Sequence, residues 1–269
     1  MPDPDNVFSG SIPENYDRYM VPLIFEPYAA DLAHRASALS PKRVLETAAG
    51  TGVVPRFLLP QLPADTVYIA TDLSRPMLDF AASVLPDPRV RWQSADALDL
   101  PFDDGGFDVV LCQFGAMFFP DRVRAYREAL RVLAPGGVFL FSVWDGLDKN
   151  EFAAEVTDEL AEMFPDDPPR FMARVPHGYH DIAQIERELR DAGFTRIGFD
   201  TVTAQSVAPS PLIAATAYCQ GTPVRAEIEE RDAGALQEAT ERAAARIASR
   251  YGEEEVRGRI QAHIITASN

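Results

Sequence analysis

Three acidic residues and a glycine loop are the features of this sequence best suited to bind a ligand. Glu46 ends a predicted strand and is followed by the loop Thr-Ala-Ala-Gly-Thr-Gly, which contains Gly50 and Gly52. Asp72 and Asp96 follow the next two predicted strands. Because glycine has no Cβ, such a loop lets a ligand approach backbone N–H groups at the carboxyl edge of a sheet. Carboxylates at three strand ends beside the loop predict a ligand with hydroxyl groups and a positive charge.

The loop differs from the motifs that bind phosphate groups. The dinucleotide fingerprint Gly-x-Gly-x-x-Gly rests a pyrophosphate on a helix N-terminus, but Pro55 stands at the third glycine position here. The Gly-Lys-Ser/Thr of phosphate loops is also missing. Glu46 would repel a phosphate and attract an ammonium group. We therefore expect an adenosyl amino acid, with Asp72 at the ribose and Asp96 at the adenine edge, and disfavour a nicotinamide-dependent oxidoreductase.

The elements that position these residues alternate between strands and helices. Apolar and β-branched runs alternate with amphipathic stretches, which predicts parallel β-α-β units wound into a sheet with helices on both faces. The predicted strands are Arg43–Glu46, Thr66–Thr71, Val90–Ser94, Phe107–Cys112 and Gly137–Val143, and the predicted helices between them are Val53–Leu59, Pro76–Val84 and Asp121–Val132. We expect the segment Ala134–Gly137 to stop the last helix and turn into the fifth strand.

Further helices and two further strands are predicted outside this region. They are the helices Glu26–Leu39, Asn150–Met163 and the Asp181-capped helix through Ala192, a strand within Ile197–Val207, a helical insertion from Pro211 to about Arg250 broken near Gly234, and a last strand Ile260–Thr266. We divide the chain into a lid or helical segment (1–40), a cofactor-binding core (41–207, with 145–180 partly a substrate cap), a helical insertion (208–258) and the final core strand (259–269).

The composition argues against several classes of partner. Acidic residues number 41 and basic residues 25, which gives a formal net charge of −16 and disfavours nucleic acid. The most apolar run, Gly137–Trp144, is too short to span a membrane. Cys112, Cys219 and the four histidines show no metal-ligand spacing. We expect a soluble, cytoplasmic protein with no metal and buried thiols.

Five stretches resemble the class I S-adenosylmethionine-dependent methyltransferases, particularly the small-molecule branch that includes the ubiquinone/menaquinone-biosynthesis type (methyltransferase type 11-like). They are Val44–Gly52, Thr71–Leu78, Ala95–Phe102, Phe107–Phe114 and Glu128–Gly137. The resemblance implies a doubly wound, Rossmann-like α/β fold with a seven-stranded, mostly parallel sheet. The last strand would be antiparallel, matching Ile260–Thr266. It also implies S-adenosyl-L-methionine as cofactor and a small-molecule methyl acceptor. A homodimer is a separate possibility, since the sequence does not determine the oligomeric state.

Carried over by position, the resemblance assigns the cofactor contacts. Those around the methionine part are Glu46, Ala48, Gly50 and Gly52; those around the adenosyl part are Asp72, Leu73, Met77, Asp96 and Ala97. Gln113 and Phe114 would line the methionine and sulfonium side, and Tyr19 resembles an aromatic lid, with core packing equally open. Two positions depart from the family pattern. Ala48 replaces a glycine and could crowd the loop, and the segment Ala116–Pro120 lacks a histidine common in relatives.

No catalytic base stands out in the sequence. His177 and His180 precede the helix capped by Asp181 and are weak candidates, with a surface turn the favoured interpretation. We therefore predict methyl transfer by in-line displacement, achieved mainly through proximity and orientation. A protein that binds S-adenosylmethionine without turnover is the alternative. A stripe in the insertion suits core packing, a roof over an apolar acceptor or a dimer contact; its members are Leu236, Ala239, Ala243 and Ile247.

Overall fold

The computed structural model describes residues 12–269. The predicted lid segment 1–40 therefore lies partly outside the described residues. Seven strands form one sheet: β1 Arg43–Glu46, β2 Val67–Asp72, β3 Val90–Ser94, β4 Phe107–Gln113, β5 Leu133–Trp144, β6 Arg196–Ala208 and β7 Val256–Ser268. Their order is β3-β2-β1-β4-β5-β7-β6, with β1 to β5 parallel and β7 antiparallel to β5. The expected doubly wound seven-stranded fold is confirmed.

The helices of the described residues differ in length. The longer ones are α2 Glu26–Ala38, α4 Arg75–Val84, α5 Arg122–Val132, α6 Glu151–Met163, α8 Ile182–Ala192, α9 Pro211–Gln220, α10 Val224–Arg231 and α11 Leu236–Tyr251, together with the π-helix η2 Tyr16–Phe25. The short ones are α1 Ile12–Asn15, α3 Val53–Leu58, η3 Leu59–Gln61, η4 Ala116–Phe118, η5 Leu147–Lys149 and α7 Phe171–Arg174. None of the helices in this described part is long and apolar enough to cross a membrane.

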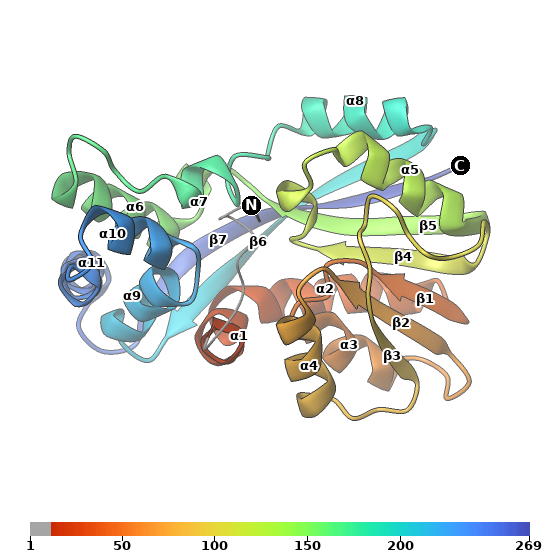
Figure 1. Cartoon of the computed structure of the whole chain (residues 1–269), viewed down its shortest axis with the longest axis horizontal. Coiled ribbons are helices and arrows are strands. Elements are labelled where there is room, and N and C mark those ends of the chain that lie inside the picture. The colour runs from red at the N-terminus through yellow and green to blue at the C-terminus, as the bar shows by residue number, and fades with distance from the viewer. Residues whose placement is uncertain (1–11) are drawn as a thin grey trace. The chain divides into compact units, whose positions relative to one another are not determined.

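The chain divides into two compact units. The sheet unit contains Pro27–Trp144, His180–Val202 and Ala262–Asn269; the helical unit contains Asp145–Tyr179, Thr203–Gln261 and the described residues 12–26. Within the sheet unit, α3 and α4 lie on one side of the strands and α5 and α8 on the other (Figure 1). This arrangement follows from right-handed β-α-β crossovers on both sides of β1 and β4. The four-part division proposed from the sequence stays a prediction.

Polar caps set the ends of the helices that flank the sheet. Asp121 accepts a hydrogen bond from Arg124 N (3.0 Å) at the start of α5, and Asp181 accepts one from Ala183 N (2.9 Å) at the start of α8. Gly193 ends α8 in the left-handed conformation, with φ of 112°. A side-chain acceptor satisfies amides that have no partner in the first helical turn. The predicted capping of α8 at both ends is confirmed.

Two sequence-based boundaries need correction. The fifth strand begins at Leu133, so Ala134–Gly137 lies within β5 instead of forming a separate turn before it. The strand is irregular there: its register against β4 shifts between Phe107 and Val109, and Gly136 has φ of 79°. Proline and glycine thus produce an irregularity at the beginning of the strand, where missing ladder bonds are tolerated. The insertion is interrupted at 221–223 as well as near Gly234.

The apolar stripe of the insertion forms the core of the helical unit. Ala239, Ala243 and Ile247 of α11 are fully buried, and α11 packs against α9 and α6. Burial of these side chains within one chain supports the core-packing interpretation of the stripe over a roof or a dimer contact. Cys112 and Cys219, as expected, are buried free thiols, and burial raises the pKa of each to about 12.

Candidate active site

The strand order reverses between β1 and β4. From β1 the chain builds outward through β2 to β3, then crosses back to place β4 on the other side of β1. In open α/β sheets, ligands bind at the carboxyl ends of the strands at such a point. The loop after β1, the end of β2 and the start of the segment after β4 meet at this edge. The predicted acidic residues Glu46 and Asp72 both belong to it.

Four hydrogen bonds donated by backbone amides hold the glycine loop in place. They are Thr47 N to Leu111 O, Ala49 N to Thr71 O, Gly50 N to Asp72 Oδ2 and Gly52 N to Ala49 O, each 2.9 Å long. Three loop residues have positive φ: Ala48 at 53°, Gly50 at 55° and Gly52 at 78°. The loop is therefore preorganised by the neighbouring strands β2 and β4.

The two glycines of the loop serve different purposes. A Cβ on Gly52 would lie 2.7 Å from Cη2 of Trp92, so this glycine lets α3 approach β3. A Cβ on Gly50 would meet only Cε of Met77, at 3.9 Å. Gly50 is thus the residue whose backbone stays open to a ligand, while Gly52 is required by packing. The sequence pattern alone treated the two positions as equivalent.

Ala48, which replaces the glycine usual in the family, is accommodated by Gly115. A Cβ on Gly115 would lie 2.4 Å from the Cβ of Ala48 and 2.9 Å from Sγ of Cys112. The space beside Ala48 therefore exists because the residue after Phe114 has no side chain. The left-handed φ of Ala48 still costs about 1–2 kcal/mol relative to glycine. The extra methyl is packed against the segment after β4.

Glu46 is a buried carboxyl with one satisfied oxygen. Its side chain is 1% exposed, and Tyr68 Oη donates a hydrogen bond of 2.6 Å to Oε2. Oε1 has no hydrogen-bond partner among residues 12–269. Burial raises the pKa of Glu46 to about 8, against the opposing effect of the Tyr68 hydrogen bond, and the negative charge of Asp72 adds to the rise. A cationic ligand beside this carboxyl would favour its charged form.

Asp72 braces the loop while keeping further acceptor capacity. Oδ2 accepts from Gly50 N (2.9 Å) and Oδ1 from Ser74 N (2.7 Å). Burial raises the pKa of Asp72, and backbone hydrogen bonds from Ser74, Gly50 and Leu73 oppose that rise. Each carboxylate oxygen has a second lone-pair site, so two ribose hydroxyls fit the remaining capacity. Ser74 precedes α4 without capping it through its side chain.

The other adenosyl candidates differ in exposure. Leu73 is 66% exposed and Met77 is buried. Asp96 is exposed, its Oδ1 accepts from Leu98 N (2.9 Å), and Ala97 is half-buried. Leu73 thus offers an apolar surface at the end of β2, whereas Asp96 shapes the turn after β3.

An aromatic cluster lies at the ends of β4 and β5. Gln113 is half-buried, and Phe114, with φ of 51°, is buried. The ring of Phe114 stacks on Trp144, with centroids 3.9 Å apart and planes at 7°. Tyr28 meets both rings edge-on, at 5.4 and 5.3 Å. Sequence reasoning missed Tyr28 and Trp144, although Trp144 could have been found as the residue directly after the fifth predicted strand; the observed strand ends on it.

Comparison with known proteins identifies the family. Residues 45–141 match the family model of a methyltransferase domain. A ubiquinone/menaquinone biosynthesis C-methyltransferase of Ectopseudomonas mendocina is 30% identical over 180 residues, which cover 62% of this chain and 70% of that protein. This chain belongs to the class I S-adenosylmethionine-dependent methyltransferases. The methyl donor implied by the family is S-adenosylmethionine, as expected. Membership also removes the support for a nicotinamide-dependent oxidoreductase.

Other relatives of this methyltransferase match part of its length or its fold. A demethylmenaquinone methyltransferase of Thermus thermophilus is 41% identical over 118 residues, which are 41% of this chain and 53% of that protein. The chain thus spans about half the length of this curated relative. The crystal structure of YcgJ from Bacillus subtilis superimposes with a TM-score of 0.56 at 18% identity, over 90% of this chain and 97% of that one. That likeness shows the fold.

The lid and base candidates of the methyltransferase fall in both units. Tyr19 lies half-buried in η2 of the helical unit, with the Arg18 guanidinium 5.2 Å from its ring centroid. His180 is exposed in the sheet unit. His177, in the helical unit, is buried, so the expected surface turn is wrong for this residue. Its Nδ1 lies 2.9 Å from the carbonyl oxygen of Asp145. The amide nitrogen Nδ2 of Asn150 lies 3.4 Å from the same ring nitrogen.

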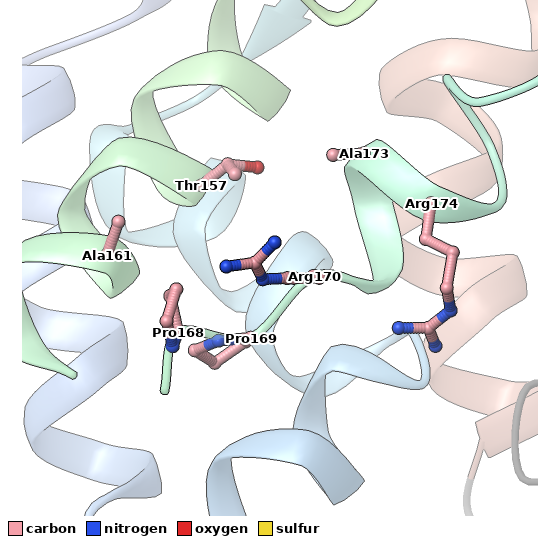
Figure 2. A pocket seen from close by; sticks show the side chains of 7 residues that line it. All are labelled: Thr157, Ala161, Pro168, Pro169, Arg170, Ala173 and Arg174. Carbon is pink, nitrogen blue, oxygen red and sulfur yellow. The ribbon is translucent and has the colours of Figure 1, made fainter. Parts of the chain in front are cut away.

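The helical unit also contains an open, mainly apolar pocket of about 520 Å³ (Figure 2). Its lining comes from α6, from the segment before α7 and from α7 itself: Thr157, Ala161, Pro168, Pro169, Arg170, Ala173 and Arg174. Glu227 of α10 fixes that segment, because it accepts from Arg170 N (2.7 Å), Phe171 N (3.0 Å) and Arg174 Nη2 (3.0 Å). None of the proposed cofactor residues lines this pocket. No group of three or more potential metal ligands occurs among the residues from 12 onward.

Proposed function

We propose that this chain transfers a methyl group from S-adenosylmethionine to a small-molecule acceptor. The observation that carries the proposal is the set of Glu46, Gly50 and Asp72 at one sheet edge, where one carboxyl oxygen of Glu46 has no partner among the described residues. Asp72 would accept hydrogen bonds from the ribose hydroxyls, and Glu46 would meet the ammonium group. The remaining proposed contacts are Tyr19, Ala48, Gly52, Leu73, Met77, Asp96, Ala97, Gln113 and Phe114.

The residues at this edge suit catalysis by orientation. The bound donor supplies a methyl group on a sulfonium, which an acceptor atom displaces in line. Holding nucleophile and methyl carbon about 3–3.5 Å apart is worth roughly 7–11 kcal/mol in well-oriented models. Glu46 and Asp72 anchor the two ends of the donor in our proposal. The Phe114 ring, fixed by its stack on Trp144, would favour the sulfonium through cation–π attraction.

We propose that no single general base dominates the reaction. Replacing His177 or His180 by alanine is expected to lower kcat by less than about tenfold, whereas loss of a general base costs about 100- to 10,000-fold. The measurement is kcat at saturating donor and acceptor, with donor affinity determined separately by calorimetry. Abolished turnover with intact donor affinity in either variant would contradict the proposal.

The acceptor we propose is an apolar or aromatic small molecule, with quinone-type compounds the first to test. Two relatives described above are named for demethylmenaquinone methylation and for ubiquinone/menaquinone biosynthesis. The chain's own support is the aromatic and sulfur-rich segment after β4, which includes Met117, Phe118 and Phe119.

A labelled-donor screen tests the function directly. The chain is incubated with methyl-labelled S-adenosylmethionine and a panel of small acceptors that includes demethylated quinones. Labelled product and equimolar S-adenosylhomocysteine are expected with at least one of them. Tight donor binding with no S-adenosylhomocysteine formed across the panel would favour the alternative, a protein that binds the donor without turnover.

A further inference from the structure

Tyr68 is the residue that fixes the buried carboxyl of Glu46. Tyr68 lies in β2, where it pairs with Val44, and Ala70 pairs with Glu46. Its side chain is fully buried, and its hydroxyl reaches Oε2 of Glu46 at 2.6 Å. Burial and the adjacent carboxyl raise the pKa of Tyr68 well above its ordinary value, so the hydroxyl stays a donor. Oε2 therefore already accepts a hydrogen bond. Oε1 is the side-chain oxygen of Glu46 that accepts none from residues 12–269.

We propose that Tyr68 is a positioning residue for the cofactor's ammonium group: it holds Glu46 by Oε2, leaves Oε1 for the ligand, and makes ligand binding release one proton from Glu46. The inference rests on the proposed function, because it places the ammonium at Glu46. The released proton goes to the buffer. A positively charged ligand then meets a carboxylate instead of a neutral acid.

The groups around Glu46 set the direction of this coupling. Tyr68 and Asp72 face it from β2, and Cys112 faces it from β4. The thiol of Cys112, with a pKa of about 12, is neutral at physiological pH. With the pKa of Glu46 near 8, the free protein carries the acid form below that value. Binding of an ammonium ligand therefore strengthens about tenfold per pH unit as pH rises toward 8 and then levels off.

The hydrogen bond from Tyr68 affects the pH range over which the affinity for an ammonium ligand rises. The Tyr68 hydroxyl donates to the carboxylate and so favours the charged form. In Tyr68→Phe the pKa of Glu46 rises further, and one oxygen loses its only donor among residues 12–269. Affinity for S-adenosylhomocysteine near neutral pH is expected to fall about tenfold, and the rising part of its pH profile should extend to higher pH. A ligand without the amino-acid group, 5′-methylthioadenosine, should bind equally well to both proteins at every pH.

Calorimetric titration between about pH 6 and 8.5 tests the proposal on the full chain. It uses both ligands, in two buffers of different ionisation enthalpy to count released protons. Wild-type protein should release about one proton with S-adenosylhomocysteine near neutral pH and none with 5′-methylthioadenosine. Tyr218→Phe, which removes another buried tyrosine hydroxyl, serves as the matched control. It should behave as wild type.

Each outcome has a distinct meaning. An unchanged pH profile and affinity in Tyr68→Phe overturns the inference. If that variant does not fold, Glu46→Gln replaces it: its affinity for S-adenosylhomocysteine should be independent of pH, and a wild-type slope would overturn the inference. Failure of wild-type protein to bind either ligand would instead contradict the proposed function.

Discussion

The carboxylate of Asp72 has two roles in our proposal. It accepts hydrogen bonds from two backbone amides, those of Gly50 and Ser74, and in our proposal it also receives the ribose hydroxyls. Both tasks need an acceptor on each oxygen. A carboxylate meets this requirement, whereas an amide offers one oxygen and turns its NH₂ toward a donor.

The change Asp72→Asn tests this double role. Affinity for S-adenosylhomocysteine is expected to fall at least about tenfold, since charge-assisted hydrogen bonds contribute about 1.5–3 kcal/mol. The thermal midpoint should also fall, because the loop loses a brace. Asp79→Asn on α4, an exposed carboxylate paired with Arg75, is the control and should leave both values unchanged. Calorimetry and thermal melts give the two readouts; an undiminished affinity would refute the ribose placement.

The packing of Ala48 against Gly115 can also be tested by substitution. The methyl group of Ala48 occupies the space that a side chain at position 115 would need. Gly115→Ala should lower the free energy of unfolding by about 2 kcal/mol or more through overpacking. Adding Ala48→Gly should recover much of that loss, since the clash partner is removed and left-handed strain is relieved. A double-mutant cycle in denaturant measures the coupling. Additive effects would show that the two positions do not share the space.

At the scale of elements, charged side chains connect α6 to α11. Glu155 and Glu159 of α6 are buried, and the arginines that reach them come from α11. Arg246 Nε lies 3.0 Å from Glu155 Oε2, and Arg242 Nε lies 2.7 Å from Glu159 Oε1. Because burial removes the competing hydration of these charges, losing one partner costs more than at the surface. The network therefore helps to hold the two helices in register.

Glu155→Gln should lower the free energy of unfolding by roughly 2–4 kcal/mol, because Arg246 and Arg250 each lose one charged partner. Glu162→Gln removes another carboxylate bonded to Arg246, but this one is 62% exposed. Exposed pairs contribute only about 0–1 kcal/mol. Chemical denaturation of both variants provides the comparison. Equal losses would mean that burial of Glu155 does not govern the strength of the pair.

At the scale of the whole molecule, the raised pKa of Glu46 makes stability depend on pH. The folded protein keeps the proton up to about pH 8, whereas the unfolded chain releases it near the ordinary value of 4.5. The unfolded state therefore binds fewer protons in this window, and the free energy of unfolding falls as pH rises from 4.5 to 8. We expect ionisation of Glu46 to lower the free energy of unfolding by roughly 3–5 kcal/mol across this pH range.

Glu46→Gln isolates this contribution from the rest of the molecule's negative charge. Urea denaturation of wild type and variant between about pH 5 and 8 should show stability declining more steeply in wild type. Parallel curves would contradict the pKa assigned to Glu46. The possible homodimer stays a prediction, and sedimentation velocity on the same samples tests it.

The sequence by itself determined most of the helices and strands. It also determined at which strand ends the proposed site residues lie. The strand bounds Arg43–Glu46 and Val90–Ser94 agree with the structure, and β2 runs one residue later than predicted, from Val67 to Asp72. These features depend on local periodicity, turn residues and caps, which act over a few positions. The family resemblance supplied the antiparallel last strand, which local pattern does not encode.

Only the tertiary structure decided which side chains become partners. Tyr68 donates a hydrogen bond to Glu46, which lies 22 positions away in the sequence. The missing side chains of Gly52 and Gly115 leave room for Trp92 and Ala48, respectively. The burial of His177 also had no signal in its turn-like neighbourhood. Such contacts depend on strand order and register, which bring distant residues together. Burial then sets the electrostatics, because the same carboxyl has an ordinary pKa in water and a raised one inside the sheet.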